Sequence, residues 1–494
     1  MIMLSVGSPS LKEVLKKASP DDRMIQIEGD IRVCEPLVIP DFTKITGTTG
    51  RIILSDEGTL ILSGSDITLE NLSIEGGQYA VCIDSHGKNI SNIKIQNCRL
   101  DGFTIAGITV AASESHSRMS DILIEECQLN CGMVAGCDPV WGCAVAIGLY
   151  AAATDKEPGI QDAVLEDVTV RNCTIRGRSI CSIISIVGVN KTPEDRSIFF
   201  TDCHVRRLHI LNNDVADSTD TAICAEADYI NHINCSMRDV EICGNRVEHG
   251  IFGISCTGGS PVSGNSFGAS LVNTKVIGNE TIGRDTVTEG NFGIVVMGGH
   301  LDGSLAENHD CFVVGIEIAN NHVSHVGRGI TVCGGHAAAD INAPFGLVGN
   351  YVDKAFIHHN ILEEVETCFI LAGAWLEGRR LDWYSGYGRR YNTWGDEITD
   401  HYTQTVVAKN NYIRNIEVCH NHCKGYRFYL LAAGALGSGH GYMIGNRAND
   451  HIIFEKNTHE LGENRQYVAD GFFTDWSSGE ENLVDMKLKY AISK

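Results

Sequence analysis

The sequence predicts an all-β solenoid, in which a single chain winds as a stack of coils, and three observations predict it. Short apolar segments with period-two alternation recur along the chain, and a second, glycine-led strand follows many of them. The composition also suits many tight turns, with 53 Gly against 9 Pro in 494 residues. Short alternating segments rich in Ile and Val are typical of β-strands, and their repetition predicts coils laid on one another.

The first repeated segment alternates apolar and variable positions and carries a small residue at its sixth position. Cysteine fills that position early in the chain and asparagine later. A stacked Asn column can satisfy buried polar groups from coil to coil, and a thiol can fill the same slot by packing. We therefore interpret the column as structural. Its members are Leu72, Cys98, Cys127, Cys173, Cys203, Asn213, Asn245, Asn279, Asn321, Asn360, Asn421 and Asn457.

The second repeated segment includes two nearly identical phrases, "GIVVMGGH" ending at His300 and "GITVCGGH" ending at His336. Alignment of all copies gives a column of Tyr229, Ser260, His300, His336 and Trp375. Neighbouring coils lie about 4.8 Å apart, so the two imidazoles are predicted to lie side by side. They could share a substrate or a proton, or be polar residues solvated at a turn, and both readings stay open.

Charge and composition narrow the class of protein. The formal net charge of -23 opposes binding to nucleic acid, whose backbone attracts basic surfaces. No run of eighteen apolar residues predicts a membrane span, and the first residues lack the features of a signal peptide. The 19 cysteines contain no CxxC pair, which favours reduced thiols over a metal site. A cytoplasmic location without a metal or other cofactor is the resulting expectation.

Three regions are predicted along the chain. Residues 1–24 form an N-terminal capping segment, residues 25–460 the coils, and residues 461–494 a C-terminal cap or tail. A helix is expected in the first region, because Ser10 and Glu13 have the spacing of a capping box before an apolar face.

The repeats between about residues 25 and 460 resemble the right-handed parallel β-helix of the pectate-lyase-like superfamily. This resemblance implies a helix covering the open end of the first coil, long loops on one side, and a carbohydrate-active function. Narrower motifs point in several directions. Gly439-His440-Gly441 looks like an element of polygalacturonases, without the paired aspartates that accompany it there. "DTAICAEADY" is loosely similar to the inulin fructotransferase and difructose-anhydride hydrolase family.

Extra chain length falls mainly after the second repeated strand, at residues 260–273, 300–312, 336–355, 375–404 and 435–450. Loops on one side of a rigid solenoid would form a groove. The longest insertion is rich in Trp, Tyr and Arg, which stack on sugar rings and bind carboxylates, although the same residues also favour subunit contacts. The predicted substrate-binding residues are Trp375, Glu377, Arg379, Arg380, Trp383, Tyr384, Arg390, Trp394 and His440.

Paired carboxyl groups are the strongest catalytic candidates, because glycoside hydrolysis normally uses one as acid and one as base or nucleophile. Asp220, Glu226 and Asp228 surround one predicted strand. If that strand is regular, Glu226 and Asp228 face the same side. Two carboxyl groups that lie so close together would have pKa values that are pushed apart. Together with His300 and His336, these three residues are the predicted catalytic set.

Three functions are compatible with these patterns. The first is a glycoside hydrolase or transglycosidase that uses the paired carboxylates on an oligosaccharide or polysaccharide. The second is a polysaccharide lyase acting on a uronate-containing glycan by β-elimination, for which Ca²⁺ would be a fitting cofactor. The third is a non-catalytic glycan-binding or adhesion module. No nucleic acid or membrane partner is expected, and a homo-oligomer, a dimer or a trimer, stays open.

Overall fold

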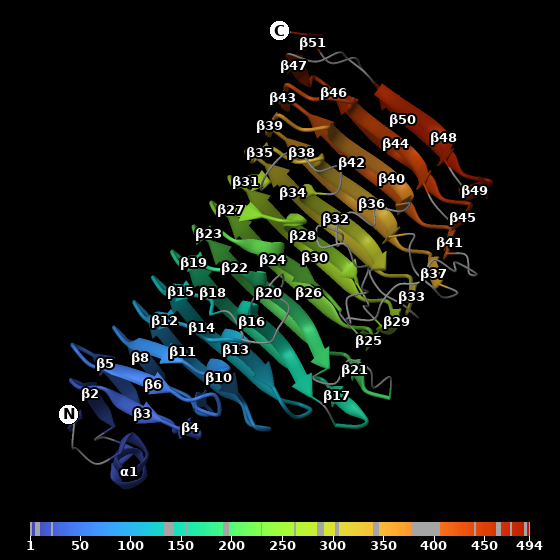
Figure 1. The fold of residues 1–494 in the computed structure, drawn as a ribbon. Helices are drawn as coiled ribbons and strands as arrows, with labels where there is room; N and C mark the ends of the chain where they lie inside the picture. The colour runs from blue at the N-terminus through green and yellow to red at the C-terminus, as the bar shows by residue number, and fades with distance from the viewer. Residues whose placement is uncertain are drawn as a thin grey trace, which may run out of the picture.

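The chain winds as a parallel β-helix, and successive coils follow one another along a single axis from the N-terminus to the C-terminus (Figure 1). Every strand pairing in the described part of the chain is parallel, as between β32 (Phe292–Leu301) and β36 (Arg328–Ala338), and a few pairings contain a register shift. The predicted fold class is therefore confirmed. The computed structural model describes residues 2–4, 10–20, 23–132, 143–154, 156–190, 197–228, 230–260, 263–283, 291–301, 306–338, 345–377, 406–438, 441–460, 466–474, 477–488 and 492–493.

The described strands form four parallel sheets. The first sheet holds β1 (Ile2–Leu4), β2 (Met24–Ile27), β5 (Lys44–Gly47), β8 (Ile67–Glu70), β11 (Ile90–Gln96), β14 (Arg118–Glu125), β18 (Val164–Arg171), β22 (His204–Leu211), β26 (Ser236–Cys243), β30 (Ser270–Ile277), β34 (Phe312–Ala319), β38 (Tyr351–His358), β42 (Tyr412–Cys419), β46 (Arg447–Glu455) and β50 (Leu483–Leu488). The second sheet holds β3 (Ile31–Val33), β6 (Arg51–Leu54), β9 (Ser73–Gly76), β12 (Arg99–Asp101), β15 (Gln128–Asn130), β19 (Thr174–Arg176), β23 (Asp214–Val215), β27 (Arg246–His249), β31 (Glu280–Gly283), β35 (His322–Ser324), β39 (Ile361–Glu363), β43 (His422–Lys424), β47 (Thr458–Glu460) and β51 (Ile492–Ser493).

The third sheet contains the glycine-led strands of the second repeat. It holds β4 (Pro36–Ile39), β7 (Thr59–Leu62), β10 (Tyr79–Asp84), β13 (Ala106–Ala112), β16 (Cys143–Thr154), β20 (Ser179–Asn190), β24 (Ser218–Glu226), β28 (Phe252–Gly259), β32, β36, β40 (Thr367–Glu377), β44 (Tyr429–Ser438) and β48 (Gln466–Thr474). The fourth sheet holds β17 (Gly159–Gln161), β21 (Phe199–Thr201), β25 (Ile230–Ile233), β29 (Ser263–Phe267), β33 (Ala306–His309), β37 (Phe345–Val348), β41 (Val406–Lys409), β45 (Gly441–Ile444) and β49 (Ser477–Glu480).

The fourth sheet begins only at β17, so the first coils have three strands and the later coils have four. It also corrects the prediction of long loops after the third-sheet strands. The insertion at 260–273, for example, contains β29 and the start of β30. Part of the length that was expected to be loop is therefore an additional strand in each later coil.

The predicted asparagine column is a continuous hydrogen-bonded ladder at the turn from the first to the second sheet. The Nδ2 group of Asn321 donates to Oδ1 of Asn360 at 2.9 Å, and the backbone N–H of Asn321 donates to the same oxygen at 3.0 Å. The same pair of bonds repeats from Asn213 to Asn457. Each buried Asn side chain therefore forms hydrogen bonds with the Asn of the neighbouring coil, as the sequence predicted.

Cys203 does not belong to this column, which is a correction. The backbone N–H of Cys173 donates directly to Asn213, so those two residues are neighbours in the first ladder. Cys203 lies at the turn from the fourth to the first sheet, where a second ladder contains Cys235, Cys311, Asn350, Asn411, Asn446 and Asn482. The two turns share one local pattern, because both place a left-handed residue before the buried amide, as at Asn320 and Gly349.

A single apolar core runs inside the solenoid from Leu4 to Phe454. Helix α1 (Leu11–Lys17) begins with the predicted capping box between Ser10 and Glu13, and its Leu11, Val14 and Leu15 join that core. The helix lies at the N-terminal end of the stack (Figure 1). The region 461–494, which was predicted as a cap or tail, adds β48, β49, β50 and β51 to the four sheets.

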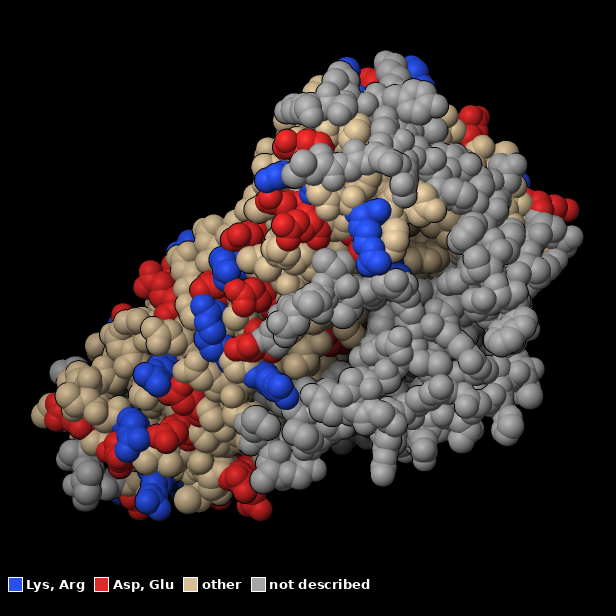
Figure 2. All heavy atoms as spheres, turned by 45° about the horizontal axis from the view of Figure 1, so that its top comes forward, with Lys and Arg blue, Asp and Glu red and all other residues tan. Residues whose placement is uncertain are grey.

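Acidic and basic side chains are interspersed along the face seen in Figure 2. Many of them form ion pairs between neighbouring coils. Arg51 contacts Asp30 at 2.7 Å and Glu75 at 2.6 Å, and Lys275 contacts Glu241 at 2.9 Å. Exposed pairs of this kind contribute little to stability. Within the described residues, no helix has the length and apolar character needed to cross a membrane.

Candidate functional site

The candidate site lies on the outer face of the third sheet, where side chains that point away from the core form separate clusters. In β32, Ile294 and Val296 belong to the interior core, whereas Val295 and Met297 belong to a cluster on the other face. This alternation ends at Gly298 and Gly299. A Cβ at Gly298 would lie 2.5 Å from the carbonyl oxygen of Tyr351, and a Cβ at Gly299 would lie 2.6 Å from Cγ of Asn350. Both glycines therefore face inward, and the strand bends there.

The bend explains why the phrase Gly-Gly-His recurs. A regular strand of eight residues spans about 26 Å. Phe292 begins β32 and is in register with Arg328, whereas His300 near its end is in register with His336. Yet the ring centroids of Phe292 and His336 are only 6.1 Å apart, and those of Phe252 and His300 are 6.3 Å apart. The third sheet is therefore curved, and the two ends of its strands approach each other over the outer face.

We call this concave surface the outer trough. One wall consists of residues near the strand starts, Thr221, Phe252, Phe292 and Arg328, and the other of residues near the strand ends, Ser260, His300, His336 and Trp375. The floor consists of two outward-facing rows between these walls, which include Cys224, Ser255 and Val295 in one row and Glu226, Thr257 and Met297 in the other.

His300 and His336 form a buried pair, which confirms the predicted register. Their rings stack with a centroid distance of 4.9 Å, and their Nδ1 atoms lie 2.8 Å apart. Burial lowers the pKa of His300 to about 4. Burial, with the charges of His300 and Arg328 as smaller causes, lowers the pKa of His336 well below its usual value. Both rings are therefore neutral at neutral pH, and neither is a solvated turn residue.

Aromatic and cationic groups complete this part of the trough. Trp375 packs on His336 with a centroid distance of 4.9 Å and on Phe292 at 5.7 Å. The guanidinium of Arg328 lies 4.8 Å from the ring centre of Phe292 and 4.6 Å from that of Trp375. Cation–π contacts of this kind are strongest when they are desolvated, and Arg328 is only 8% exposed. Among the predicted substrate-binding residues, Trp375 is thus packed inside the trough.

Two of the predicted carboxylates, Asp220 and Glu226, lie together on the outer face of the preceding coil. Burial, followed by the charge of Glu226, raises the pKa of Asp220 to about 7. Burial also raises the pKa of Glu226, whereas hydrogen bonds from Cys224, Ser255 and Ser260 oppose that rise. Both side chains remain partly exposed to solvent.

The surroundings of Glu226 fix its position on the outer face. The hydroxyl of Ser255 donates to Oε1 of Glu226 at 3.1 Å, and Ser255 lies 3.3 Å from Thr257. Burial and then the charges of Asp220 and Glu226 raise the pKa of the Cys181 thiol, which packs on the same face. Asp220 lies at a bulge near the start of β24, and Glu226 lies near its end. Their carboxyl groups therefore face the same region of the outer face.

Asp228 does not share this face, contrary to the prediction. Strand β24 ends at Glu226, and Ala227 belongs to the interior core, as regular alternation predicts. The backbone N–H of Ser260 donates to Oδ1 of Asp228, whose side chain is fully buried. Burial raises the pKa of this carboxyl well above its usual range, and its charge contributes to the raised pKa of the interior Cys235 thiol. The expected alternation therefore holds through Ala227 and fails at Asp228, so that two consecutive residues face the interior.

The remaining predicted substrate-binding residues cannot be placed with the site. Arg379, Arg380, Trp383, Tyr384, Arg390, Trp394 and His440 lie outside the described residues, and Glu377 is described only as the last residue of β40. The sequence analysis also missed residues that line the trough. Phe252, Phe292 and Arg328 stand at the first outward position of their strands, two residues before an Ile of the interior core, and that shared spacing is the signal that could have identified them.

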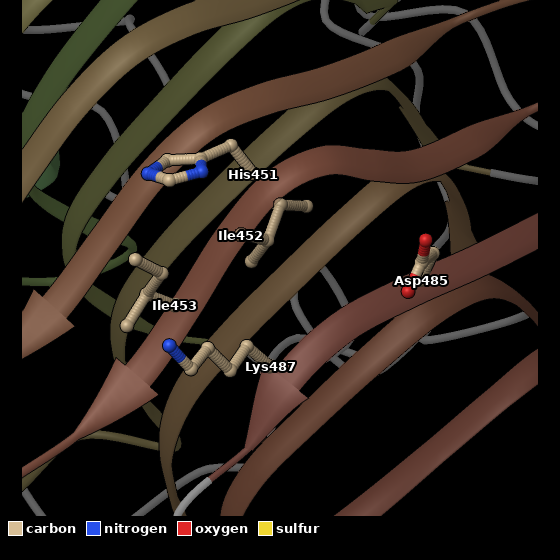
Figure 3. Close-up of a pocket in the computed structure, with 5 residues that line it drawn as sticks. All are labelled: His451, Ile452, Ile453, Asp485 and Lys487. Carbon is tan, nitrogen blue, oxygen red and sulfur yellow. The ribbon is translucent and has the colours of Figure 1, made fainter.

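A separate shallow pocket of about 210 Å³ lies on the first sheet near the C-terminus. His451, Ile452 and Ile453 line it from β46, and Asp485 and Lys487 line it from β50 (Figure 3). It contains none of the predicted site residues. Across the described residues, no group of three or more His, Cys, Asp or Glu side chains is arranged to hold a metal ion.

Comparisons with known proteins return similarity to solved structures only. No protein-family model matches the chain, and no curated protein matches it. One similar structure is the catalytic domain of a GH87 alpha-1,3-glucanase in complex with nigerose, at 10% identity and a TM-score of 0.37, with 85% of this chain and 65% of that chain covered. Another is the A-module of the Azotobacter vinelandii mannuronan C-5 epimerase AlgE4, at 10% identity, a TM-score of 0.33 and 96% coverage of both chains. A third is PfbA, a surface adhesin of Streptococcus pneumoniae, at 10% identity and a TM-score of 0.34, with 67% of this chain and 84% of that chain covered.

Proposed function

We propose that this protein is a carbohydrate-active enzyme that cleaves or transfers a glycosidic bond, with Asp220 and Glu226 as its two carboxyl groups. The observation that carries the proposal is their relationship on the outer face. Two partly exposed carboxyl groups share a low-dielectric space, and the charge of one helps to raise the pKa of the other to about 7. A pair of neighbouring carboxyl groups is what acid and base roles at one glycosidic bond require.

The roles are assigned from the surroundings of the two carboxyl groups. Asp220 keeps its proton up to a pH of about 7, so it is the group that can protonate the leaving oxygen. Burial is the main cause of the raised pKa of Asp220 and the charge of Glu226 is the second, so we assign the ionised role to Glu226. The hydroxyl of Ser255 donates to Glu226 and holds it in place. Glu226 then activates water or an acceptor hydroxyl, or attacks the sugar carbon itself.

The proposal assigns no catalytic role to Asp228, whose carboxyl group faces the interior. His300 and His336 are neutral groups packed in the trough rather than an acid and a base at the bond. Three further expectations stay predictions from the sequence. They are that the long insertion binds sugar, that the protein is cytoplasmic, and that it forms a homo-oligomer.

The test is a screen of purified protein on a panel of oligosaccharides and polysaccharides, with new reducing ends as the readout. Glu226→Gln and Asp220→Asn should each lower turnover by at least 100-fold, on the order of the effect of losing a general acid or base. Asp239→Asn removes the same charge from an exposed position on the first sheet and should leave turnover unchanged.

Two outcomes would contradict the proposal. Unsaturated sugar products, detected by their ultraviolet absorbance, would indicate a lyase instead. Binding of a glycan without any turnover that depends on Glu226 would indicate a non-catalytic module. Both variants must retain the melting temperature of the parent protein within a few degrees for the comparison to count.

A further inference from the structure

The solvent exposure of the outer trough differs on the two sides of the carboxyl pair, Asp220 and Glu226. Toward the N-terminus, Val145, Tyr150 and Cys181 on its surface are partly exposed. Toward the C-terminus, the described outward-facing residues of β28, β32, β36 and β40 are buried, including Phe252 and Met297, whereas Tyr429 on β44, in register with Thr367, is exposed. Asp220 and Glu226 on β24 lie at the boundary between the open and the closed part.

The closed part is filled by side chains that contact one another, which we call the aromatic block: Phe252, Phe292, His300, His336 and Trp375. Phe252 stacks on Phe292 with a centroid distance of 4.9 Å, and it also contacts the edge of His300. A sugar ring between two aromatic faces would need a separation of about 7–8 Å, twice an ordinary van der Waals contact. No ring pair in the block leaves that space, so a glycan cannot continue along the trough past Phe252.

The open part offers a surface on which sugars can bind. Tyr150 lies against the outer face, since a Cβ at Gly148 would be only 2.5 Å from its hydroxyl oxygen. Ile184 and Ile186 are buried beneath it, and the partly exposed side chains of Val145 and Cys181 pack on the same cluster. The coils of β16, β20 and β24 together extend over about 10 Å of the axis. Aromatic and apolar groups at this spacing suit the C–H faces of sugar rings.

We propose that the enzyme acts at the end of a glycan chain, because the aromatic block closes the trough directly beside the carboxyl pair on one side and the trough is open on the other. This inference rests on the proposed function. The terminal sugar residues lie against the aromatic block, and the rest of the chain leaves over Tyr150. The bond between them breaks when Asp220 gives its proton to the leaving oxygen and water, deprotonated with the help of Glu226, adds to the sugar carbon. Each turnover therefore consumes one water and releases one short product of fixed length.

The test is the product distribution of the active substrate from the panel, supplied as a linear oligosaccharide series labelled at one end. At low conversion, a single short product should account for nearly all cleavage. Phe252→Ala removes the first ring of the block and should raise internal cleavage on the order of tenfold, since a changed pocket contact is commonly worth 10- to 200-fold. Phe267→Ala, an exposed ring on the fourth sheet, is the matched control.

Phe252→Leu provides a second variant that keeps the site apolar if Phe252→Ala fails to fold, and it should shift the products in the same direction. Internal fragments from the parent protein at the earliest times would overturn the inference while leaving the proposed function intact. Absence of any turnover that depends on Glu226 would overturn both. A single product from the parent and from both Phe252 variants would show that the block does not set the cleavage position, and would also overturn the inference.

Discussion

Nδ1 of His300 lies 2.8 Å from Nδ1 of His336 in the next coil, and both rings are buried. Only one of the two nitrogens can carry the shared hydrogen, so the rings adopt opposite tautomers. The pair is thus a structural contact between neighbouring coils, made by two uncharged imidazoles within the aromatic block.

The first prediction concerns acid stability. The unfolded chain protonates this histidine below a pH of about 6.5, whereas folded His300 protonates only near 4. The unfolded state therefore binds the proton first, and the free energy of unfolding should fall by about 2–3 kcal/mol as the pH drops from 6.5 to 4. His300→Gln should lose less stability over this range in urea titrations, whereas His309→Gln, on a more accessible ring, should behave like the parent.

The second prediction concerns the pH dependence of turnover. Asp220 must carry a proton to act as the acid, and its pKa is about 7. Values of kcat/KM should therefore fall tenfold per pH unit above 7, and should also fall at low pH, where Glu226 becomes protonated. A profile that stays flat from pH 6 to pH 9 would exclude Asp220 from this role.

The third prediction concerns the first asparagine ladder. Replacing Asn321 by Ala leaves the backbone N–H of Asn279 and the carbonyl of Val276 without their partners. Each unsatisfied buried group costs about 1–3 kcal/mol, so the free energy of unfolding should fall by about 2–6 kcal/mol. Cys98→Ala, at the same slot in an early coil, should cost less because no amide pairing is lost. Equal losses in chemical denaturation would contradict the ladder as a source of stability.

The fourth prediction concerns the glycine that allows the bend. Ala at position 298 would bring its Cβ within 2.5 Å of Tyr351 and 2.6 Å of Gly334, and both contacts are with backbone oxygens that cannot move aside cheaply. We expect a loss of at least 1–3 kcal/mol, about the cost of overpacking. Gly346→Ala, where the nearest atom is 3.5 Å away, is the control and should change thermal unfolding little.

The fifth prediction concerns the long insertion. Trp383 and Trp394 lie outside the described residues, and their role in binding sugar is predicted from composition. If they bind substrate, replacing both by Ala should raise KM and leave the pH profile unchanged. An unchanged KM with an altered mass in light scattering would favour the alternative, a contact between subunits.

The sequence allowed the coils, their register and the first ladder to be predicted, because each depends on a local pattern that repeats. His300, His336 and Trp375 aligned correctly for that reason. The fourth sheet could not be predicted in the same way, since strands such as β33 are short and lie in polar stretches. Cys203 was misplaced because two different turns share one local signature.

The trough itself could not be read from the sequence, since its curvature depends on contacts between distant segments. Gly298 and Gly299 bend the strand against Tyr351 and Asn350, which are about fifty residues later in the chain. The inward orientation of Asp228 likewise departs from the period of the strand.

The change from three to four strands at β17 limits how such a molecule can lengthen in evolution. Duplicating one coil before β17, or one coil after it, yields a copy whose edges match both neighbours. An early coil has no strand in the fourth sheet. If it were moved into the later stretch, fourth-sheet strands such as β29 would lose their neighbour, and their backbone hydrogen-bonding groups would be unpaired. The protein is therefore built from two kinds of coil that are not interchangeable. Only the four-stranded kind carries Asp220, Glu226 and the aromatic block.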